Sequence, residues 1–242
     1  MDILFNASAG SSLGIEVEPQ LADRESRELR SGASQILQRL EAERGEAHPK
    51  AKNELIESNI ELITGVCSTV AEARADLEGT LGEVVPVAHE LGLALLCAGT
   101  HPFSEWSAQE ITDNERYHRL VDEVQWPARR MAIFGIHTHV GVRSAEKAIA
   151  IANALCGYIP HFLALSASSP WWQGRDTRLA FARSKVFLGL AAAAVVALVA
   201  AVICLLSGCS RPTTGPARRD SSAPPAPAVP EPEPGPPPAG LV

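Results

Sequence analysis

The sequence lacks clusters of basic residues and pairs of closely spaced cysteines. Its 21 Lys and Arg are outnumbered by 28 Asp and Glu, which gives a formal net charge of −7 at pH 7. Because nucleic-acid phosphates are bound by clustered Lys and Arg, this balance argues against a nucleic-acid partner. None of the five cysteines forms a Cys-x-x-Cys pair, so the chain offers no zinc-ribbon or dithiol redox motif.

An N-terminal leader is also missing from the sequence as given. Residues 1–12 have neither a basic start nor a long apolar stretch, so we expect no signal peptide. Cys67, Cys97 and Cys156 lie among apolar neighbours, as reduced and buried thiols do. We therefore expect a cytoplasmic N-terminal part.

Charged residues are absent from residues 186–209, and this absence divides the chain into three parts. We expect a globular domain over residues 1–187 and an apolar segment over 186–208. That segment is long enough to span a hydrocarbon core of about 30 Å and so to anchor the chain to the inner membrane. Residues 209–242 contain most of the 18 prolines and should form a disordered tail. A membrane anchor, a fused lipoprotein start and a frameshifted reading remain open as explanations of the apolar segment.

Apolar and acidic residues alternate over residues 14–18, which predicts a β-strand with two glutamates on one face. Glu16 and Glu18 would then lie about 7 Å apart on a rigid ladder. Two carboxylates held this way repel each other unless a cation lies between them, which favours a hard divalent ion such as Mg²⁺. The alternative is an edge strand with a solvated acidic face. Pro19 favours an edge position or a bulge near the end of this strand.

A second acidic stretch covers residues 51–64, and β-branched residues favour a strand at its end. In a regular strand Glu57 and Glu61 share one face and Glu54 points away. A bulge or a helical start could bring Glu54 round to the others. An amphipathic strand with solvated acids is the alternative.

A histidine-bearing strand is predicted over residues 131–142. His137 and His139 are two positions apart and share one face with three neighbouring small or apolar positions, two of them glycine. No third nitrogen or sulfur ligand has suitable spacing for zinc. A phosphate or Mg²⁺ site explains the pattern better, and Arg143 follows the strand directly.

Helical spacing predicts helices between these strands. They cover about residues 33–42, 67–91, 112–124, 144–156 and 158–166, and a short strand covers 94–98. Pro86 should kink the second helix or split it in two. Residues 167–175, which carry Trp171 and Trp172, read as a loop.

Five motifs in this order resemble one family. They are Gly14-Ile15-Glu16-Val17-Glu18; Glu54-Leu55-Ile56-Glu57-Ser58 with Glu61-Leu62-Ile63-Thr64; Ala98-Gly99-Thr100-His101-Pro102-Phe103; Gly135-Ile136-His137-Thr138-His139-Val140-Gly141-Val142; and Ser166-Ala167-Ser168-Ser169-Pro170 with the Trp171–Thr177 stretch. The chain over about residues 5–187 resembles glutamate–cysteine ligase type 2, a family of carboxylate–amine ligases. The resemblance covers the N-terminal half of that family.

The resemblance implies an α+β fold: part of a glutamine-synthetase-like antiparallel sheet with packed helices. It implies a ligase that uses ATP and Mg²⁺ to join the side-chain carboxylate of glutamate to an amine such as cysteine, giving γ-glutamylcysteine. The substrates would be small molecules. By the same resemblance, the metal ligands are Glu16, Glu18, Glu54 and Glu61; His137, His139 and Arg143 face the metal or phosphates; and Arg143, Arg175 and His139 are catalytic.

Two features depart from the family pattern. Pro19 stands where such strands carry a larger side chain, and the resemblance ends near Phe187. We therefore expect impaired activity. The alternative is a non-catalytic, membrane-tethered module that binds a nucleotide or amino acid, or a truncated pseudoenzyme.

Overall fold

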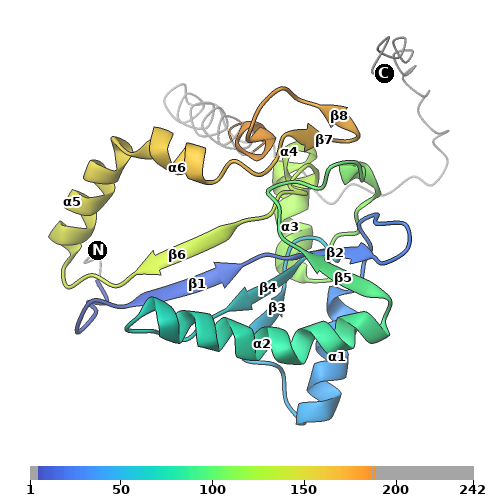
Figure 1. Ribbon diagram of the computed structural model, residues 1–242, viewed down its shortest axis with the longest axis horizontal. Coiled ribbons are helices and arrows are strands. Elements are labelled where there is room, and N and C mark those ends of the chain that lie inside the picture. Colours follow the sequence, from blue (N-terminus) through green and yellow to red (C-terminus); the bar gives the residue numbers. More distant parts are fainter. Residues whose placement is uncertain (1–4, 187, 189–242) are drawn as a thin grey trace, which may run out of the picture. The chain divides into compact units, whose positions relative to one another are not determined.

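Four antiparallel strands form the main sheet of the computed structural model, in the order β3-β4-β1-β6 (Figure 1). They are β1 (Leu13–Val17), β3 (Ala51–Asn53), β4 (Ile60–Ile63) and β6 (Ile136–Val140). The structure describes residues 5–186 and Leu188, and all of them belong to one compact unit. The fold is α+β with an antiparallel sheet, as the sequence predicts. The predicted domain boundaries at residues 187 and 208 lie outside the residues that the structure describes.

A single segment of chain passes from the main sheet into a second one at Pro19. After β1 ends, β2 (Gln20–Asp23) pairs with β5 (Leu93–Leu96) in a separate two-stranded sheet. Proline has no N–H to donate to a ladder, so the regular pairing of β1 ends before it. Irregular contacts with the β4 segment continue, since the Ile60 N–H donates to the Pro19 carbonyl at 3.3 Å. The predicted edge position is wrong, because β1 lies between β4 and β6.

Two helices, α1 (Ala33–Arg44) and α2 (Val70–Glu90), pack on the sheets and on each other. Their apolar side chains meet those of β2–β5 in one core, whose fully buried members include Leu21, Ile36, Ile60, Leu62, Val84 and Leu93. Each such side chain contributes about 1.5–3 kcal/mol by leaving water. This core covers the apolar face of the β1–β4 pair. The acidic face of the pair therefore points away from the core, toward the site described below.

The second helix stays whole across Pro86. Its first turn is capped by the Thr69 hydroxyl, which accepts a hydrogen bond from the Glu72 N–H at 3.1 Å. Gly92, at φ +72°, follows its end as the sequence predicts. The predicted split is wrong, because α2 continues to Glu90. Burial of Val84, Val87 and Ala88 on both sides of the proline stabilises the last turns.

A second, smaller core lies around α3 (Glu115–Val124) and α4 (Trp126–Arg129), with a short 3₁₀ turn at Trp106–Ala108. Phe134, Ile56 and Val121 are buried there. The Arg130 guanidinium lies 4.0 Å above the Trp126 ring. Phe134 therefore anchors the chain directly before the histidine strand.

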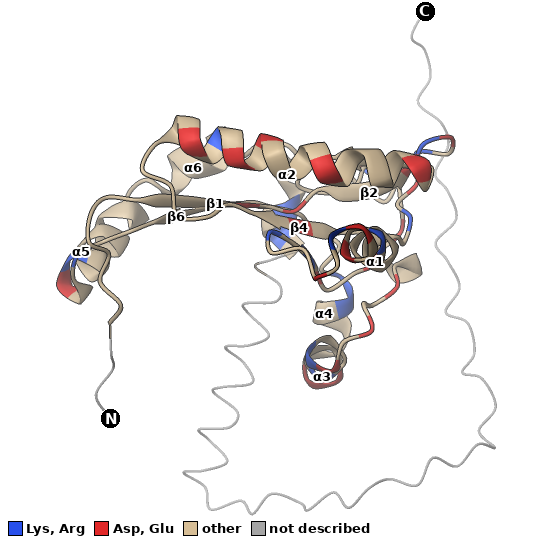
Figure 2. Cartoon of the chain, turned by 90° about the horizontal axis from the view of Figure 1, so that it is seen from below, with Lys and Arg blue, Asp and Glu red and all other residues tan. Residues whose placement is uncertain are grey.

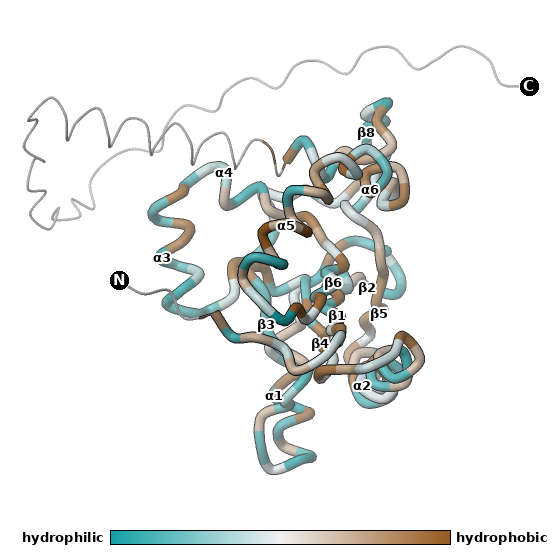
Figure 3. The backbone as a smooth tube through the Cα atoms, turned by 90° about the vertical axis from the view of Figure 1, so that its left-hand side faces the viewer, coloured by the Kyte–Doolittle hydropathy of each residue, from teal (hydrophilic) through white to brown (hydrophobic). Residues whose placement is uncertain are grey.

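Most residues of the two helices that follow β6 are exposed. α5 (Ala145–Cys156) begins at the predicted cap Ser144, and α6 (Ile159–Leu165) has Pro160 in its first turn. Neither helix has a buried residue, although both carry many of the hydrophobic positions coloured brown in Figure 3. Within the described residues no single helix could cross a membrane. By length and composition this bent pair, with 72° between its halves, could do so together.

Two predictions about the last segments have different outcomes. Instead of a loop, the residues after 170 form a hairpin of β7 (Trp171–Trp172) and β8 (Arg175–Asp176). The predicted anchor at 186–208 lies outside the described residues except at Val186 and Leu188, and the predicted tail lies wholly outside them.

Candidate functional site: a cluster of carboxylates and histidines

One face of the main sheet carries the predicted acids and histidines together. Glu16 is opposite Ile63 on β4 and opposite His137 on β6. Side chains at alternate positions share a face, so Glu18, Glu61 and His139 point to the same side. The alternation of apolar and acidic residues therefore predicts the face correctly, and the apolar partners point into the core.

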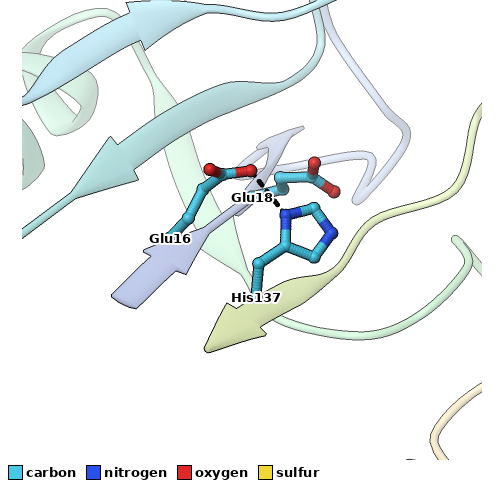
Figure 4. A group of neighbouring side chains, drawn as sticks. All are labelled: Glu16, Glu18 and His137. Atoms are coloured by element: carbon cyan, nitrogen blue, oxygen red, sulfur yellow. Dashed lines mark hydrogen bonds and ion pairs between the residues drawn. The ribbon is translucent and has the colours of Figure 1, made fainter. Parts of the chain in front are cut away.

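The tightest group is Glu16, Glu18 and His137 (Figure 4). One ligand atom from each lies within 4.8 Å of the others. Both glutamates project from the β1 segment toward the His137 ring, whose Nδ1 is 2.5 Å from Glu16 Oε1. His139 extends the group, since its Nε2 is 3.5 Å from Glu16 Oε2.

The remaining acids, Glu54 and Glu61, form a pair beside this group. Burial, a hydrogen bond to the Glu54 carboxyl and the charge of Glu16 raise the pKa of Glu61 to about 7. Glu54 reaches the pair because β3 ends at Asn53, so its side chain is released from strand alternation. We call these six residues (Glu16, Glu18, Glu54, Glu61, His137 and His139) the carboxylate–histidine cluster.

Burial also raises the pKa of Glu18. The nearby His137 lowers it, Glu54 raises it further, and a backbone hydrogen bond at Gly135 and the charge of Arg183 lower it. A carboxylate whose pKa is raised lacks enough positive charge around it to stabilise its ionised form. A hard divalent cation supplies that charge and prefers carboxylate oxygens, so the residues fit a cation such as Mg²⁺.

Glu57, which sequence alternation places beside Glu61, does not join the cluster. It lies in the turn before β4, and its carboxylate accepts hydrogen bonds from the Ser34 hydroxyl at 2.6 Å and the Ser34 N–H at 3.1 Å. These contacts satisfy donors in the first turn of α1. Glu57 therefore has a structural role.

The two arginines predicted to be catalytic lie apart from the cluster in the structure. Arg143 is exposed in the loop after β6, three residues past the end of the strand. Arg175 is exposed on β8, in a hairpin that the Gly174 N–H joins to the Pro102 carbonyl at 2.9 Å. The structure therefore brings together the predicted acids and histidines but not Arg143 or Arg175, whose roles stay predictions.

A different arginine lies beside the cluster. Arg183 lowers the pKa of Glu18 through its charge and lines a pocket with Glu18 and His137. The motifs gave no signal for it, because it follows the last motif and no spacing links it to the histidine strand. Elsewhere in the described part of the chain, Lys and Arg are scattered singly over the elements, as Figure 2 shows.

Comparison with known families shows the family of the chain. The sequence model of glutamate–cysteine ligase family 2 matches residues 12–202, which is more than half of the chain. The chain belongs to this family. The match extends past residue 187, where the motif resemblance ends, into the apolar segment.

Similar proteins are found in several bacteria. A protein of Frankia casuarinae, provisionally named glutamate–cysteine ligase 2-1, is 58% identical over 191 residues, which cover 78% of this chain and 50% of the relative. A provisionally named glutamate–cysteine ligase 2 of Thermobifida fusca is 48% identical over 188 residues, covering 77% and 47%. The chain thus spans about half the length of these relatives.

A crystal structure of glutamate–cysteine ligase from Francisella tularensis in complex with AMP is also similar to this chain. The sequence identity is 16% and the TM-score 0.45, with 62% of this chain and 30% of the other covered.

Proposed function

We propose that the chain carries the metal-binding part of an ATP-dependent carboxylate–amine ligase that joins glutamate to an amine such as cysteine. The single observation that supports this proposal is the convergence of four glutamates and two histidines on one sheet face. Membership of glutamate–cysteine ligase family 2 supports the reaction class. A glutamine-synthetase-like sheet and the use of Mg²⁺ belong to the same proposal.

In the proposed reaction, a carboxylate oxygen of the glutamate side chain attacks the γ-phosphorus of ATP, and ADP leaves. The amine nitrogen then attacks the resulting acyl carbon, loses a proton, and phosphate leaves as the amide forms. The first step brings two negative groups together, and in the second step negative charge develops on the departing phosphate, so positive charge near the phosphate lowers both barriers. When bound, Mg²⁺ supplies positive charge to the phosphate oxygens.

The chain's own residues have separate tasks in this proposal. Glu16, Glu18, Glu54 and Glu61 hold the cation from two strands and one turn. His137 is oriented by its contact with Glu16 at 2.5 Å, and His139 lies beside the same carboxylate. Arg143 and Arg175 would have to approach phosphate or substrate carboxylate from exposed segments.

Calorimetric titration with Mg²⁺ and Mg·ATP tests the proposal without depending on turnover. We expect saturable binding by the intact chain and loss of it in Glu16→Gln. A second assay incubates the chain with ATP, Mg²⁺, glutamate and cysteine and measures phosphate and dipeptide. Equal cation affinity in Glu16→Gln and the parent would refute the metal role.

A further inference from the structure

A pocket of about 500 Å³ opens beside the carboxylate–histidine cluster. Its walls come from the end of β1, the turn after β5, the start of β6, the end of α6 and the segment around Arg183. Most of the lining is apolar, including Phe134, Ile136, Leu165 and Phe181. Glu18 and Arg183 are its charged side chains, and Glu18 and His137 are the two members of the cluster that line it. Such a mainly apolar cavity with a few convergent polar groups is typical of small-molecule sites.

Three polar atoms of this pocket converge where Gly135 has no side chain. A Cβ built on Gly135 would lie 2.8 Å from Arg183 Nη2, 3.1 Å from His137 Nε2 and 3.3 Å from Glu18 Oε2. A methyl group would therefore displace the arginine. The glycine leaves a small polar gap in an otherwise apolar wall.

The backbone of Arg183 is held firmly, whereas its guanidinium is only partly satisfied. Its backbone N–H donates to the Ser169 hydroxyl at 3.2 Å, and Ala182 N–H donates to the Ser169 carbonyl at 2.8 Å. Ser169 itself is 2% exposed. In contrast, the buried Nε of Arg183 has no hydrogen-bond partner among the described residues. An unsatisfied buried donor is unfavourable, so an incoming acceptor that hydrogen-bonds the guanidinium would be favoured.

We propose that this pocket binds a carboxylate group of the amino-acid substrate, and that Arg183 is the residue that pairs with it. The inference rests on the proposed ligase function and assigns the substrate subsite within it. A guanidinium offers parallel donors that match a carboxylate. The pocket has one positively charged side chain, Arg183, and also faces the Glu18 carboxylate. A multiply charged phosphate chain would therefore be repelled there. A singly charged carboxylate on an apolar stem suits both the lining and the charge.

The expectation of buried thiols is confirmed for Cys67 but wrong for Cys97 and Cys156, which are exposed. Cys97 lines the same pocket and therefore provides a direct readout of occupancy. Burial raises the pKa of its thiol, so labelling should be slow enough to follow. Cys156 is exposed on α5, does not line the pocket, and serves as an internal reference. The experiment labels the full chain with a maleimide and quantifies both cysteines by peptide mass spectrometry. Glutamate, Mg·ATP and inorganic phosphate are the three probes.

We expect glutamate to slow labelling of Cys97 and to leave Cys156 unchanged. Arg183→Met should raise the glutamate concentration for half-protection about tenfold or more, because a charge-assisted hydrogen bond is lost. Arg183→Lys should retain part of the protection. Gly135→Ala fills the gap but keeps the Arg183 guanidinium. It should weaken the protection of Cys97 by glutamate while the fold persists. Lys185→Met, which alters an exposed neighbour of Arg183, is the matched control and should behave like the parent.

Three results would overturn the inference. They are protection by Mg·ATP or phosphate but not by glutamate, unchanged protection in Arg183→Met, and unchanged protection in Gly135→Ala. Failure of the proposed function is a separate result: Glu16→Gln would bind Mg²⁺ like the parent. Protection by glutamate that depends on Arg183 would then still support the subsite. Circular dichroism of each variant shows whether it is folded.

Discussion

The described chain has a packed region and an outer arm, and the candidate site lies between them. The packed region consists of β1–β5, α1 and α2, and it contains the larger core. The outer arm consists of β6, α5 and α6, in which every residue of β6 is exposed and neither helix has a buried residue. The carboxylates come from the packed region and the histidines from the outer arm. A cation bound by both would therefore connect a well-supported part of the fold to a poorly supported one.

This difference also separates the hydrophobic residues that stabilise the fold from those that do not. Ile36 in α1 is 0% exposed, whereas Phe162 in α6 is 51% exposed. Hydrophobic burial is proportional to the apolar area removed from water, so equal side chains contribute unequally in the two regions.

The largest expected effect is loss of stability in the packed region. Ile36→Ala should reduce the free energy of unfolding by about 2–5 kcal/mol, because it leaves a cavity in the main core. Phe162→Ala should change it by no more than about 0.5 kcal/mol. Urea denaturation followed by circular dichroism measures both. Equal effects in the two variants would show that α6 is buried in solution.

The next effect concerns the connection between the regions. Glu16→Gln should weaken binding of Mg²⁺ by about 100-fold, since removing even a supporting partner of a ligand costs 10- to 100-fold. In the parent protein, Mg²⁺ should slow amide hydrogen exchange in β6 and leave α1 unchanged. If Mg²⁺ protects α1 and β6 equally, the two regions do not differ in the proposed way.

A smaller effect is expected from pH. Folded Glu61 keeps its proton up to a pKa of about 7, whereas 4.5 is the ordinary value. The contribution of protonated Glu61 to the free energy of unfolding is therefore fully present below about pH 4.5. It is lost as the pH rises through about 7. Thermal unfolding without added metal should show this loss, and Glu61→Gln should remove it. Glu43→Gln, at an exposed position of α1, is the control.

Mg²⁺ should reverse the pH effect in the parent protein, because the cation replaces the proton on Glu61. The stabilisation by Mg²⁺ should then be larger at about pH 8 than at about pH 5. A stabilisation that does not change with pH would contradict the role of Glu61 as a ligand.

The smallest effects compare two helix caps. Thr69 caps α2 in the packed region and Ser144 caps α5 in the outer arm. Replacing either by Ala should cost its helix about 1 kcal/mol. Thr69→Ala should lower the global free energy of unfolding by that amount, whereas Ser144→Ala should change only local hydrogen exchange in α5. A global effect of Ser144→Ala would show that the two regions unfold together.

The sequence predicts the cluster better than it predicts its surroundings, for a physical reason. Strand alternation places Glu16 with Glu18 on one face of their strand and His137 with His139 on one face of theirs, because the side-chain period of a strand is fixed at two. The register that sets Glu16 opposite His137 comes from the pairing of β1 with β6, which the sequence pattern does not show. The direction of the Glu54 side chain depends on where β3 ends, and that end is set by tertiary contacts. Arg183 was missed because it reaches the pocket through packing around Ser169, which leaves no periodic signal.

Other differences arise from local competition. The hairpin after residue 170 has two residues in each strand, too few for alternation to be visible. Pro86 was predicted to kink or split α2, but the burial of residues on both sides of it outweighs the lost hydrogen bond and the helix stays whole. Pro19 was expected at an edge, yet it ends β1 inside the sheet and redirects the chain.

That turn at Pro19 has a mechanical consequence. The next residue, Gln20, is 1% exposed, and its side-chain amide donates to the Ala98 carbonyl at 2.8 Å. Ala98 is part of the pocket wall, while Glu16 and Glu18 lie just ahead of the proline on the same short piece of backbone. The glutamates proposed to hold the cation and the wall of the proposed substrate pocket are thus joined by a few residues of backbone and one buried hydrogen bond. A displacement of one would be transmitted to the other over this short path.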